Sequence, residues 1–283
     1  MRRLLIALVA ATAACGGRAP APAPVTPASR APAVSGDPAS LRYAMGPGRY
    51  RFESALHTEQ EVMGSTSSFD LNTSLLVSTV MGEEGGNISL VITVDSATVS
   101  GNAPGVDAAM FSAALGRTFR ALFTPAGRPI SVTTPDSTNP IFVQLGRGFR
   151  EFVPLLPPMA ITAGAAWSDT LNQVVPNPGG EGTTAVTSRR QHRVVGWETR
   201  EGQRVLHLAT AASLTLSGTG EIQGQPIELT GTGTSAIDRY VTAGGAYLGA
   251  AQADTTNLTV NVLSVGVTVP VRQAQRTTVT RLP

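Results

Sequence analysis

An alternation of apolar and polar residues with a period of two runs through most of this sequence and limits what it can fold into. Tyr50, Phe52, Ser54 and Leu56 share one side of the first such segment, and charged residues such as Glu53 lie on the other. This spacing is typical of a β-strand with one buried and one solvated face. Similar segments, rich in Thr, Val and Leu and separated by Gly, recur up to the C-terminus. They predict a mainly β protein.

Two segments depart from this pattern and predict helices. Residues 106–115 form a short helical stretch that Gly116 is placed to end. Residues 140–152 begin with a proline at a favoured first helical position, and their apolar residues recur at spacings of four and three. The expected fold class is therefore β with minor α: a curved antiparallel sheet or open β-barrel with two short helices.

The N-terminus has a different character. Residues 1–14 contain two arginines, an apolar run and a few small residues, which is the layout of a signal peptide. The run is too short to cross a bilayer, which takes roughly 20 apolar residues. Cys15 follows at once, as in a lipobox, although Thr12 stands where a Leu is usual. We expect cleavage before Cys15 and lipidation of its thiol; ordinary secretion with a free thiol is the alternative.

The rest of the chain divides into a tether and a folded part. Residues 15–40 are rich in Ala, Pro and Ser and lack periodicity, which predicts a disordered, partly polyproline II tether. Residues 41–283 are expected to form a single β-rich domain. A weak similarity between two turn segments suggests an alternative, two β halves at 41–135 and 159–283 joined by the helix 140–152. Chance similarity of two hairpin turns explains it nearly as well.

Charge and composition exclude several functions. Of the 21 basic residues, two leave with the signal peptide, so basic and acidic residues then balance at 19 each. This balance gives no reason to expect a nucleic-acid partner. Every basic residue is Arg, which excludes mechanisms that need a lysine. Cys15 is the only cysteine, so an internal disulfide is excluded and stability must come from a packed core.

The sequence offers little that points to catalysis. A nucleophile elbow, an HExxH zinc motif and a phosphate-binding loop are all missing. The segment Gly218–Gly224 is one residue too long for a dinucleotide loop and lies between strands. His57, Glu59 and Glu61 alternate on one strand face, where they form either a metal site or, as we favour, a solvated outer face. We expect no catalytic, metal-binding or cofactor-binding residues, and a protein that is not an enzyme.

The other two histidines have no partner that the sequence reveals. His192 lies in the basic run Arg189–Arg193, which indicates a solvated edge strand protected by charge, or alternatively contact with an anionic headgroup. His207 shares a strand face with apolar neighbours and is expected to be hydrogen-bonded near the core; a catalytic base is the less favoured alternative.

The candidate ligand region is the apolar, proline-broken segment between the two β parts. It is either a lid over a hydrophobic cavity or a helix packed flat on the sheet to fill it, and the second arrangement is the commoner. Its apolar side chains would be the contacts to a hydrophobic ligand: Phe142, Leu145, Phe149, Phe152, Leu155 and Leu156.

The mature region resembles a group of uncharacterised bacterial lipoproteins of unknown function. Beyond the lipobox and tether, the similarity rests on short motifs within 46–283: Gly48–Phe52, Leu156–Pro158, Trp167–Asp169 and Asp238–Gly244. No catalytic residues are known for this group, so none is carried over. A more distant likeness to Lol-type lipid and lipoprotein carriers, at the level of the fold, implies a curved sheet that holds acyl chains beside helices.

These features together predict a membrane-anchored envelope lipoprotein. Gly16 follows Cys15, where an Asp would favour inner-membrane retention, so we expect the outer membrane facing the periplasm, with the cell surface as an alternative. The expected role is non-enzymatic binding of a lipid or other hydrophobic ligand. The alternative is a structural or protein-interaction module whose partners are envelope proteins.

Overall fold

The computed structural model describes most of the chain after the predicted tether. The described residues are 41–104, 106, 108–158, 160–177, 182–222 and 224–283. The signal peptide, Cys15 and the tether lie outside them, so their predictions stay predictions. Among the described residues, no helix has the length and apolar content that a bilayer span requires.

Within the described part of the chain, the strands form one eleven-stranded sheet in which every neighbouring pair is antiparallel. The strands are β1 (Gly46–Val62), β2 (Ser65–Glu84), β3 (Asn87–Gly101), β4 (Thr118–Phe123), β5 (Pro129–Thr133), β6 (Ala166–Pro176), β7 (Gly182–Arg200), β8 (Gln203–Ile222), β9 (Gln225–Thr242), β10 (Tyr247–Val262) and β11 (Val267–Leu282).

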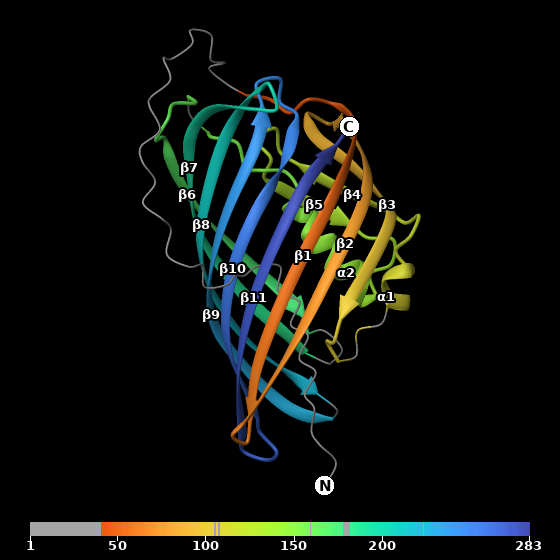
Figure 1. Cartoon of the computed structure of the whole chain (residues 1–283), viewed down its shortest axis with the longest axis vertical. Helices are drawn as coiled ribbons and strands as arrows, with labels where there is room; N and C mark the ends of the chain where they lie inside the picture. The colour runs from red at the N-terminus through yellow and green to blue at the C-terminus, as the bar shows by residue number, and fades with distance from the viewer. Residues whose placement is uncertain (1–40, 105, 107, 159, 178–181, 223) are drawn as a thin grey trace.

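The first and last strands of the described chain, β1 and β11, are neighbours in the middle of this sheet (Figure 1). From β1 it proceeds outward through consecutive hairpins to β5 at one edge. It then crosses to β6 at the opposite edge and returns strand by strand to β11. β11 pairs with β1 from Arg49↔Leu282 to Gln60↔Val271. The sheet is curved and its edges β5 and β6 do not pair, which confirms the predicted fold class.

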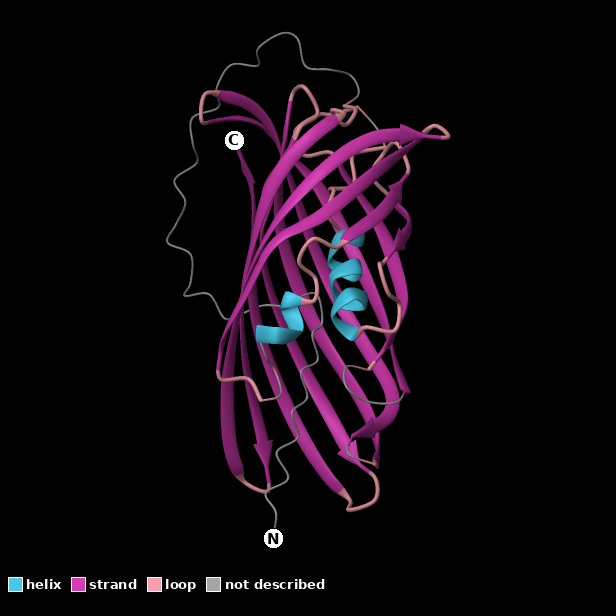
Figure 2. Ribbon diagram, turned by 90° about the vertical axis from the view of Figure 1, so that its right-hand side faces the viewer, coloured by secondary structure: helices cyan, strands magenta, loops and turns pink. Residues whose placement is uncertain are grey.

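Both segments predicted as helices are helical, over shorter spans. α1 (Ala108–Ser112) follows β3, and α2 (Pro140–Arg150) lies between β5 and β6. α2 begins as expected, because Asn139 caps it by accepting a hydrogen bond from the backbone N–H of Ile141 and Pro140 follows directly. Figure 2 shows both helices on the same side of the sheet, inside its curve. We call this side the inner face.

The predicted faces of the first strand are confirmed. Tyr50 and Leu56 are buried on the inner face, and Phe52 is partly covered there, whereas Arg51 and Glu53 are exposed on the outer face. The same alternation continues across all the long strands, so one inner face runs from β6 to β4. Its apolar residues are divided into two groups.

The upper apolar cluster is built around Tyr50, Phe119, Phe149, Phe152 and Tyr247, and it includes residues of both helices. The lower apolar cluster lies nearer the opposite end of the strands. Its members are Leu214, Leu216, Ile227, Leu229, Leu258, Val260, Val262, Val269 and Val271. Val62 of β1 and Val186 of β7 both pack against it, although these strands are not neighbours. The sheet therefore curls around the lower cluster.

Two glycines on the inner face of β9 allow this curling. A Cβ at Gly231 would lie 2.5 Å from Leu258 Cδ2, and one at Gly233 would lie 2.5 Å from the carbonyl oxygen of Thr255. Missing side chains let the neighbouring strand and its leucine approach closely, which is a known use of glycine in strands.

Candidate functional site: a polar belt inside the sheet

A band of polar side chains crosses the inner face between the two apolar clusters. The strand registers place Asp169 opposite Arg190, and Asp254 opposite both Ser235 and Gln275. On β8, for example, Leu208 belongs to the upper cluster, Thr210 to the band and Leu214 to the lower cluster. We call this band the polar belt. It consists of Ser54, Thr58, Asp169, Arg190, His192, Thr210, Ser235, Gln252, Asp254, Thr256, Gln273, Gln275 and Thr277.

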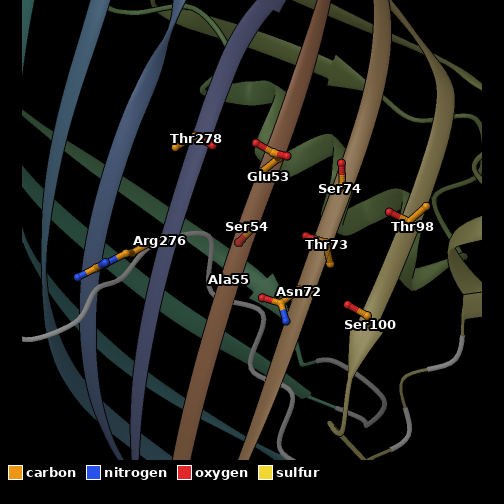
Figure 3. Close-up of a pocket in the computed structure, with 10 residues that line it drawn as sticks. All are labelled: Glu53, Ser54, Ala55, Asn72, Thr73, Ser74, Thr98, Ser100, Arg276 and Thr278. Carbon is orange, nitrogen blue, oxygen red and sulfur yellow. The ribbon is translucent and has the colours of Figure 1, made fainter.

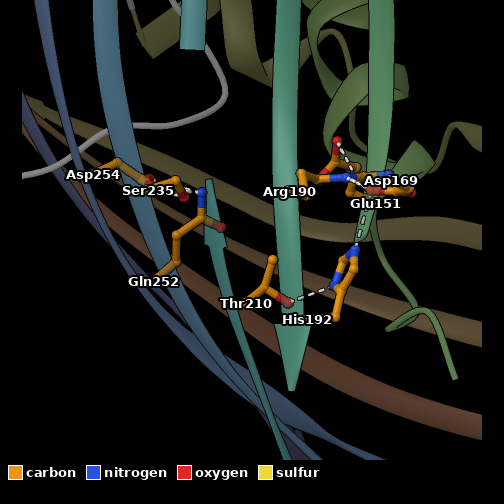
Figure 4. Close-up of polar contacts among 8 residues, drawn as sticks. All are labelled: Glu151, Asp169, Arg190, His192, Thr210, Ser235, Gln252 and Asp254. Atoms are coloured by element: carbon orange, nitrogen blue, oxygen red, sulfur yellow. Dashed lines mark hydrogen bonds and ion pairs between the residues drawn. The ribbon is translucent and has the colours of Figure 1, made fainter. Parts of the chain in front are cut away.

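One end of the belt is a buried ionic network (Figure 4). Arg190 donates from Nε and Nη2 to the two carboxylate oxygens of Asp169, at 2.7 and 2.6 Å. His192 Nε2 lies 3.1 Å from Asp169 Oδ1, and His192 Nδ1 lies 3.0 Å from Thr210 Oγ1. Arg190 Nη1 also reaches Glu151, the C-cap of α2, at 3.6 Å. The network thus connects the edge strand β6, the inner strands and the helix.

Burial and hydrogen bonding set the charges in this network. Burial lowers the pKa of His192 and outweighs the opposing effect of Asp169. The imidazole is therefore neutral at neutral pH, and it donates from Nε2 to the carboxylate and accepts at Nδ1 from the Thr210 hydroxyl. Burial alone would raise the pKa of Asp169, but hydrogen bonds from Arg190 and His192 outweigh it and lower that pKa.

The Thr210 hydroxyl, the His192 imidazole and the Asp169 carboxylate are hydrogen-bonded in the same order as the catalytic triad of acyl hydrolases. Two features distinguish this arrangement. The hydroxyl belongs to Thr210, which is 6% exposed, and the carboxylate is already held by both arms of Arg190. The contacts account for a structural ionic network, centred on the Arg190–Asp169 pair, that connects α2 and β6 to β7.

The prediction for His192 was wrong. It is 5% exposed and stacks on Trp167 with ring centroids 5.1 Å apart, rather than lying on a solvated edge. Strand alternation turns Arg190 and His192 inward and their three neighbours in the basic run outward, and β6 covers the side of β7. Asp169 and Arg190 were missed as site residues. The available signal was an Arg and a His two residues apart, on one face of a strand.

The middle of the belt holds a buried carboxyl group. Asp254 is 1% exposed. It accepts a short hydrogen bond from the Ser235 hydroxyl, and Gln252 Nε2 lies 2.9 and 2.7 Å from its two oxygens (Figure 4). Burial raises the pKa of Asp254 to about 7, although these hydrogen bonds act to lower it. The carboxyl group therefore changes charge near neutral pH.

The belt also contains hydroxyl groups without partners. Thr58 and Thr256 are both 0% exposed, and neither Oγ1 has a hydrogen-bond partner. They lie on either side of Gln273 in the register, on β1 and β10. A buried hydroxyl without a hydrogen bond costs about 1–3 kcal/mol, so such groups often mark a place where water or a ligand binds.

The apolar residues proposed as ligand contacts lie beside the belt. Phe142, Leu145, Phe149, Phe152 and Leu156 are buried in the upper apolar cluster, and Leu155 is partly exposed. The ring centroid of Phe149 lies 5.0 Å from that of Phe119, and that of Phe152 lies 4.9 Å from that of Tyr50. The segment fills the upper part of the curve, as in the commoner of the two predicted arrangements. Contact with a ligand stays a prediction.

The remaining histidines form polar contacts. His57 Nδ1 lies 2.8 Å from Asp70 and Nε2 lies 3.5 Å from Glu59, on the exposed outer face. His207 Nε2 lies 2.7 Å from Asp238 Oδ1. Among the described residues, no group of three or more His, Cys, Asp or Glu side chains could hold a metal ion.

A shallow hollow lies around Ala55 on the outer face (Figure 3). It has a volume of about 350 Å³ and spans β3, β2, β1 and β11. Its charged members are Glu53 and Arg276, and the others are small or polar: Ser54, Ala55, Asn72, Thr73, Ser74, Thr98, Ser100 and Thr278. This hollow differs in both place and chemistry from the apolar cavity that the sequence suggested.

Comparison with known proteins shows no family. No protein-family model and no curated protein matches the sequence. Among solved structures, Neisserial surface protein A is 7% identical and covers 84% of this chain and 99% of its own, with a TM-score of 0.23. A putative outer membrane lipoprotein-sorting protein domain from Vibrio parahaemolyticus is 11% identical over 80% and 83% of the two chains, with a TM-score of 0.13. A DUF1329 family protein from Desulfovibrio piger is 9% identical over 80% and 84%, with a TM-score of 0.14. Similarity at this level assigns no function.

Arg190 is predicted to be essential for stability. Arg190→Met leaves the Asp169 carboxylate buried without its main partner, which costs about 3–5 kcal/mol. Arg189→Met, next to it on the exposed face, should change the free energy of unfolding by less than about 0.5 kcal/mol. Urea denaturation measures both. Equal effects of the two substitutions would show that the buried network contributes nothing.

Asp254 is predicted to make stability depend on pH. Its pKa of about 7 in the folded protein exceeds the unfolded value of about 3.9, so the folded state binds more protons and stability falls as pH rises from about 4 to about 7. Between pH 5 and pH 8 this loss should reach about 2–3 kcal/mol. Asp254→Asn should reduce it in urea denaturation, whereas Glu228→Gln on the exposed face of β9 should not. An unchanged pH dependence in Asp254→Asn would contradict the assignment.

Proposed function

We propose that this protein is a membrane-anchored envelope lipoprotein that binds a hydrophobic ligand on the inner face of its curved sheet, without catalysing a reaction. The observation that carries the proposal is the lower apolar cluster. Its nine buried side chains, and the three partly buried ones that pack against them, all belong to strands.

An apolar sheet face normally needs a second layer to cover it. Helix residues supply that layer for the upper apolar cluster, where Phe142 and Phe149 pack against Phe119 of β4. Over the lower apolar cluster, no described helix residue does so. The curled strands gather these Leu, Ile and Val side chains into one buried apolar surface, and hydrocarbon is the chemistry that such a surface accepts.

In this proposal, the segment after α2 controls access to the lower apolar cluster. It lies inside the curve of a sheet whose edges are unpaired. It is held by aromatic contacts to Tyr50 and Tyr247 and by the ion pair between Glu151 and Arg190. Side-chain contacts of this kind can be exchanged for contacts to a ligand, whereas the pairs of the sheet cannot.

The anchor and the location rest on the N-terminal residues. Cys15 after a signal-peptide pattern supports lipidation, and the Pro-rich tether would hold the sheet away from the bilayer. Gly16 supports the outer membrane facing the periplasm.

One observation favours a second candidate function. The rings of the upper apolar cluster contact one another densely, with centroid separations of 4.9 to 6.1 Å. A core filled in this way suits a structural or protein-interaction module displayed on its tether.

The anchor can be tested directly. Cys15→Ser removes the only thiol, so the protein is expected to move from the membrane fraction to the soluble fraction of its native cells. Mass spectrometry of the wild-type N-terminal peptide should find fatty acid on Cys15 and none of the first fourteen residues. A wild-type chain with an unmodified thiol would contradict the proposed anchoring.

Ligand binding can be tested with lipid that copurifies. Wild-type protein extracted in mild detergent is expected to carry near-stoichiometric lipid in native mass spectrometry. Val267→Glu places a charge beside the lower apolar cluster and should reduce occupancy roughly tenfold, because burying a charge among apolar groups costs more than about 1.4 kcal/mol.

Val174→Glu is the matched control, since Val174 is 71% exposed on the edge strand β6. It should retain the lipid. Equal loss from both variants, or no lipid in the wild type, would favour the interaction module.

A further inference from the structure

Resting on the proposed function, we propose that Arg239 forms the headgroup site for an anionic amphiphile whose hydrocarbon lies on the lower apolar cluster. Arg239 is on the inner face of β9, opposite Leu208 on β8 and Ala250 on β10. It stands at the border between the upper apolar cluster and the polar belt.

Arg239 is a buried cation without a counterion. It is 8% exposed, yet its guanidinium forms no hydrogen bond or ion pair with another described residue. Arginine is almost never buried unless it is paired, because removing its charge from water costs several kcal/mol. Arg190, on the same face of β7, is held by Asp169 and Glu151.

The nearby acidic groups are committed elsewhere. Asp169 and Glu151 both pair with Arg190. Asp254 is hydrogen-bonded to Ser235 and Gln252, and it is close enough to Arg239 for the guanidinium to affect its pKa. Arg239 is therefore a buried cation on this face that a bound anion could neutralise, and its planar guanidinium suits phosphate or carboxylate.

The order of side chains below Arg239 matches an amphiphile. Moving down β10 from the position opposite Arg239, the inner face presents Gln252, then Asp254, then Thr256, and then Leu258 of the lower apolar cluster. Thr256, and Thr58 two strands away, are the hydroxyl groups that lack partners. An anionic group, a hydrogen-bonding linkage and a hydrocarbon chain would meet a cation, hydroxyls without partners and an apolar cluster in that order.

The test uses the full chain in detergent, and short-chain phosphatidylglycerol is the anionic lipid. Phosphatidylcholine with the same acyl chains is the zwitterionic control, and glycerol phosphate is the anion without acyl chains. Calorimetry gives the dissociation constants. Wild-type protein should bind phosphatidylglycerol more tightly than phosphatidylcholine. Arg239→Gln should weaken phosphatidylglycerol binding at least about tenfold, the typical value of a charge-assisted contact. It should leave phosphatidylcholine binding within about threefold.

Two further variants keep the result interpretable. Arg239→Lys preserves the cation and should keep the preference for phosphatidylglycerol. Arg272→Gln removes an exposed arginine from the outer face of β11 and should change neither affinity. Urea denaturation should show that Arg239→Gln is as stable as the wild type or more so, because it removes an unpaired buried charge.

The outcomes separate the two proposals. If the wild type binds both lipids and Arg239→Gln binds them with unchanged affinities, the headgroup site is overturned while the proposed function survives. If neither lipid binds to the wild type, both proposals fall. If glycerol phosphate binds as tightly as phosphatidylglycerol, the site is one for free anions and the amphiphile is wrong. A strongly destabilised Arg239→Gln would assign Arg239 a structural role and overturn the inference.

Discussion

The need to bury one apolar face with a single sheet governs this molecule. A flat sheet of eleven strands would expose that face, and no second sheet is present among the described residues. The structure combines two solutions. At one end, α2 and the residues after it supply a partial second layer, with aromatic rings against Tyr50 and Phe119. At the other end, the strands curl until residues of β1 and β7 meet the same cluster, aided by the missing side chains of Gly231 and Gly233.

The polar belt divides these two solutions, and its electrostatics follow from its burial. Polar groups removed from water need partners within the protein. The end of the belt near β6 meets this requirement fully, because two carboxylates, one arginine and one neutral imidazole satisfy one another. The middle of the belt meets this requirement partly, because the buried carboxyl group of Asp254 is readily protonated. Towards β1 the hydroxyls of Thr58 and Thr256 have no partners. On β9, where the belt borders the upper apolar cluster, Arg239 has no counterion among the described residues. These groups make the region between Arg239 and the lower cluster the part of the inner face best prepared for a ligand.

Much of the fold could be predicted because its determinants are local. The period of two identified the inner face of β1, and Pro140 with the apolar spacing after it located α2. Such signals depend on neighbours within a few residues, so they can be recognised in a single sequence. The central pairing of β1 with β11 could not be predicted in this way, since its partners are separated by most of the chain.

The candidate site was missed for the same reason. Asp169 and Arg190 are 21 residues apart, and Thr210 is a further 20 along, so no local motif joins them. In the basic run around His192, the local pattern leaves undecided which alternate residues face inward. Because most of its side chains are charged, the run indicates a solvated face. The structure shows that two of them face the interior, where Arg190 pairs with Asp169 and Glu151.

The central position of β1 has a consequence for how the chain acquires its structure. Its hydrogen-bonding partner on one side, β11, is the last strand along the described chain and is synthesised after the other ten. Until that strand emerges, β1 remains an unpaired edge, and the strands form two series of hairpins that no strand pair connects. Pairing strands so distant in sequence is slow, and the open edge can pair wrongly with another chain. A chain that stays unfolded until both of these strands have been synthesised avoids this interval, because each strand then has its partner available before it must pair.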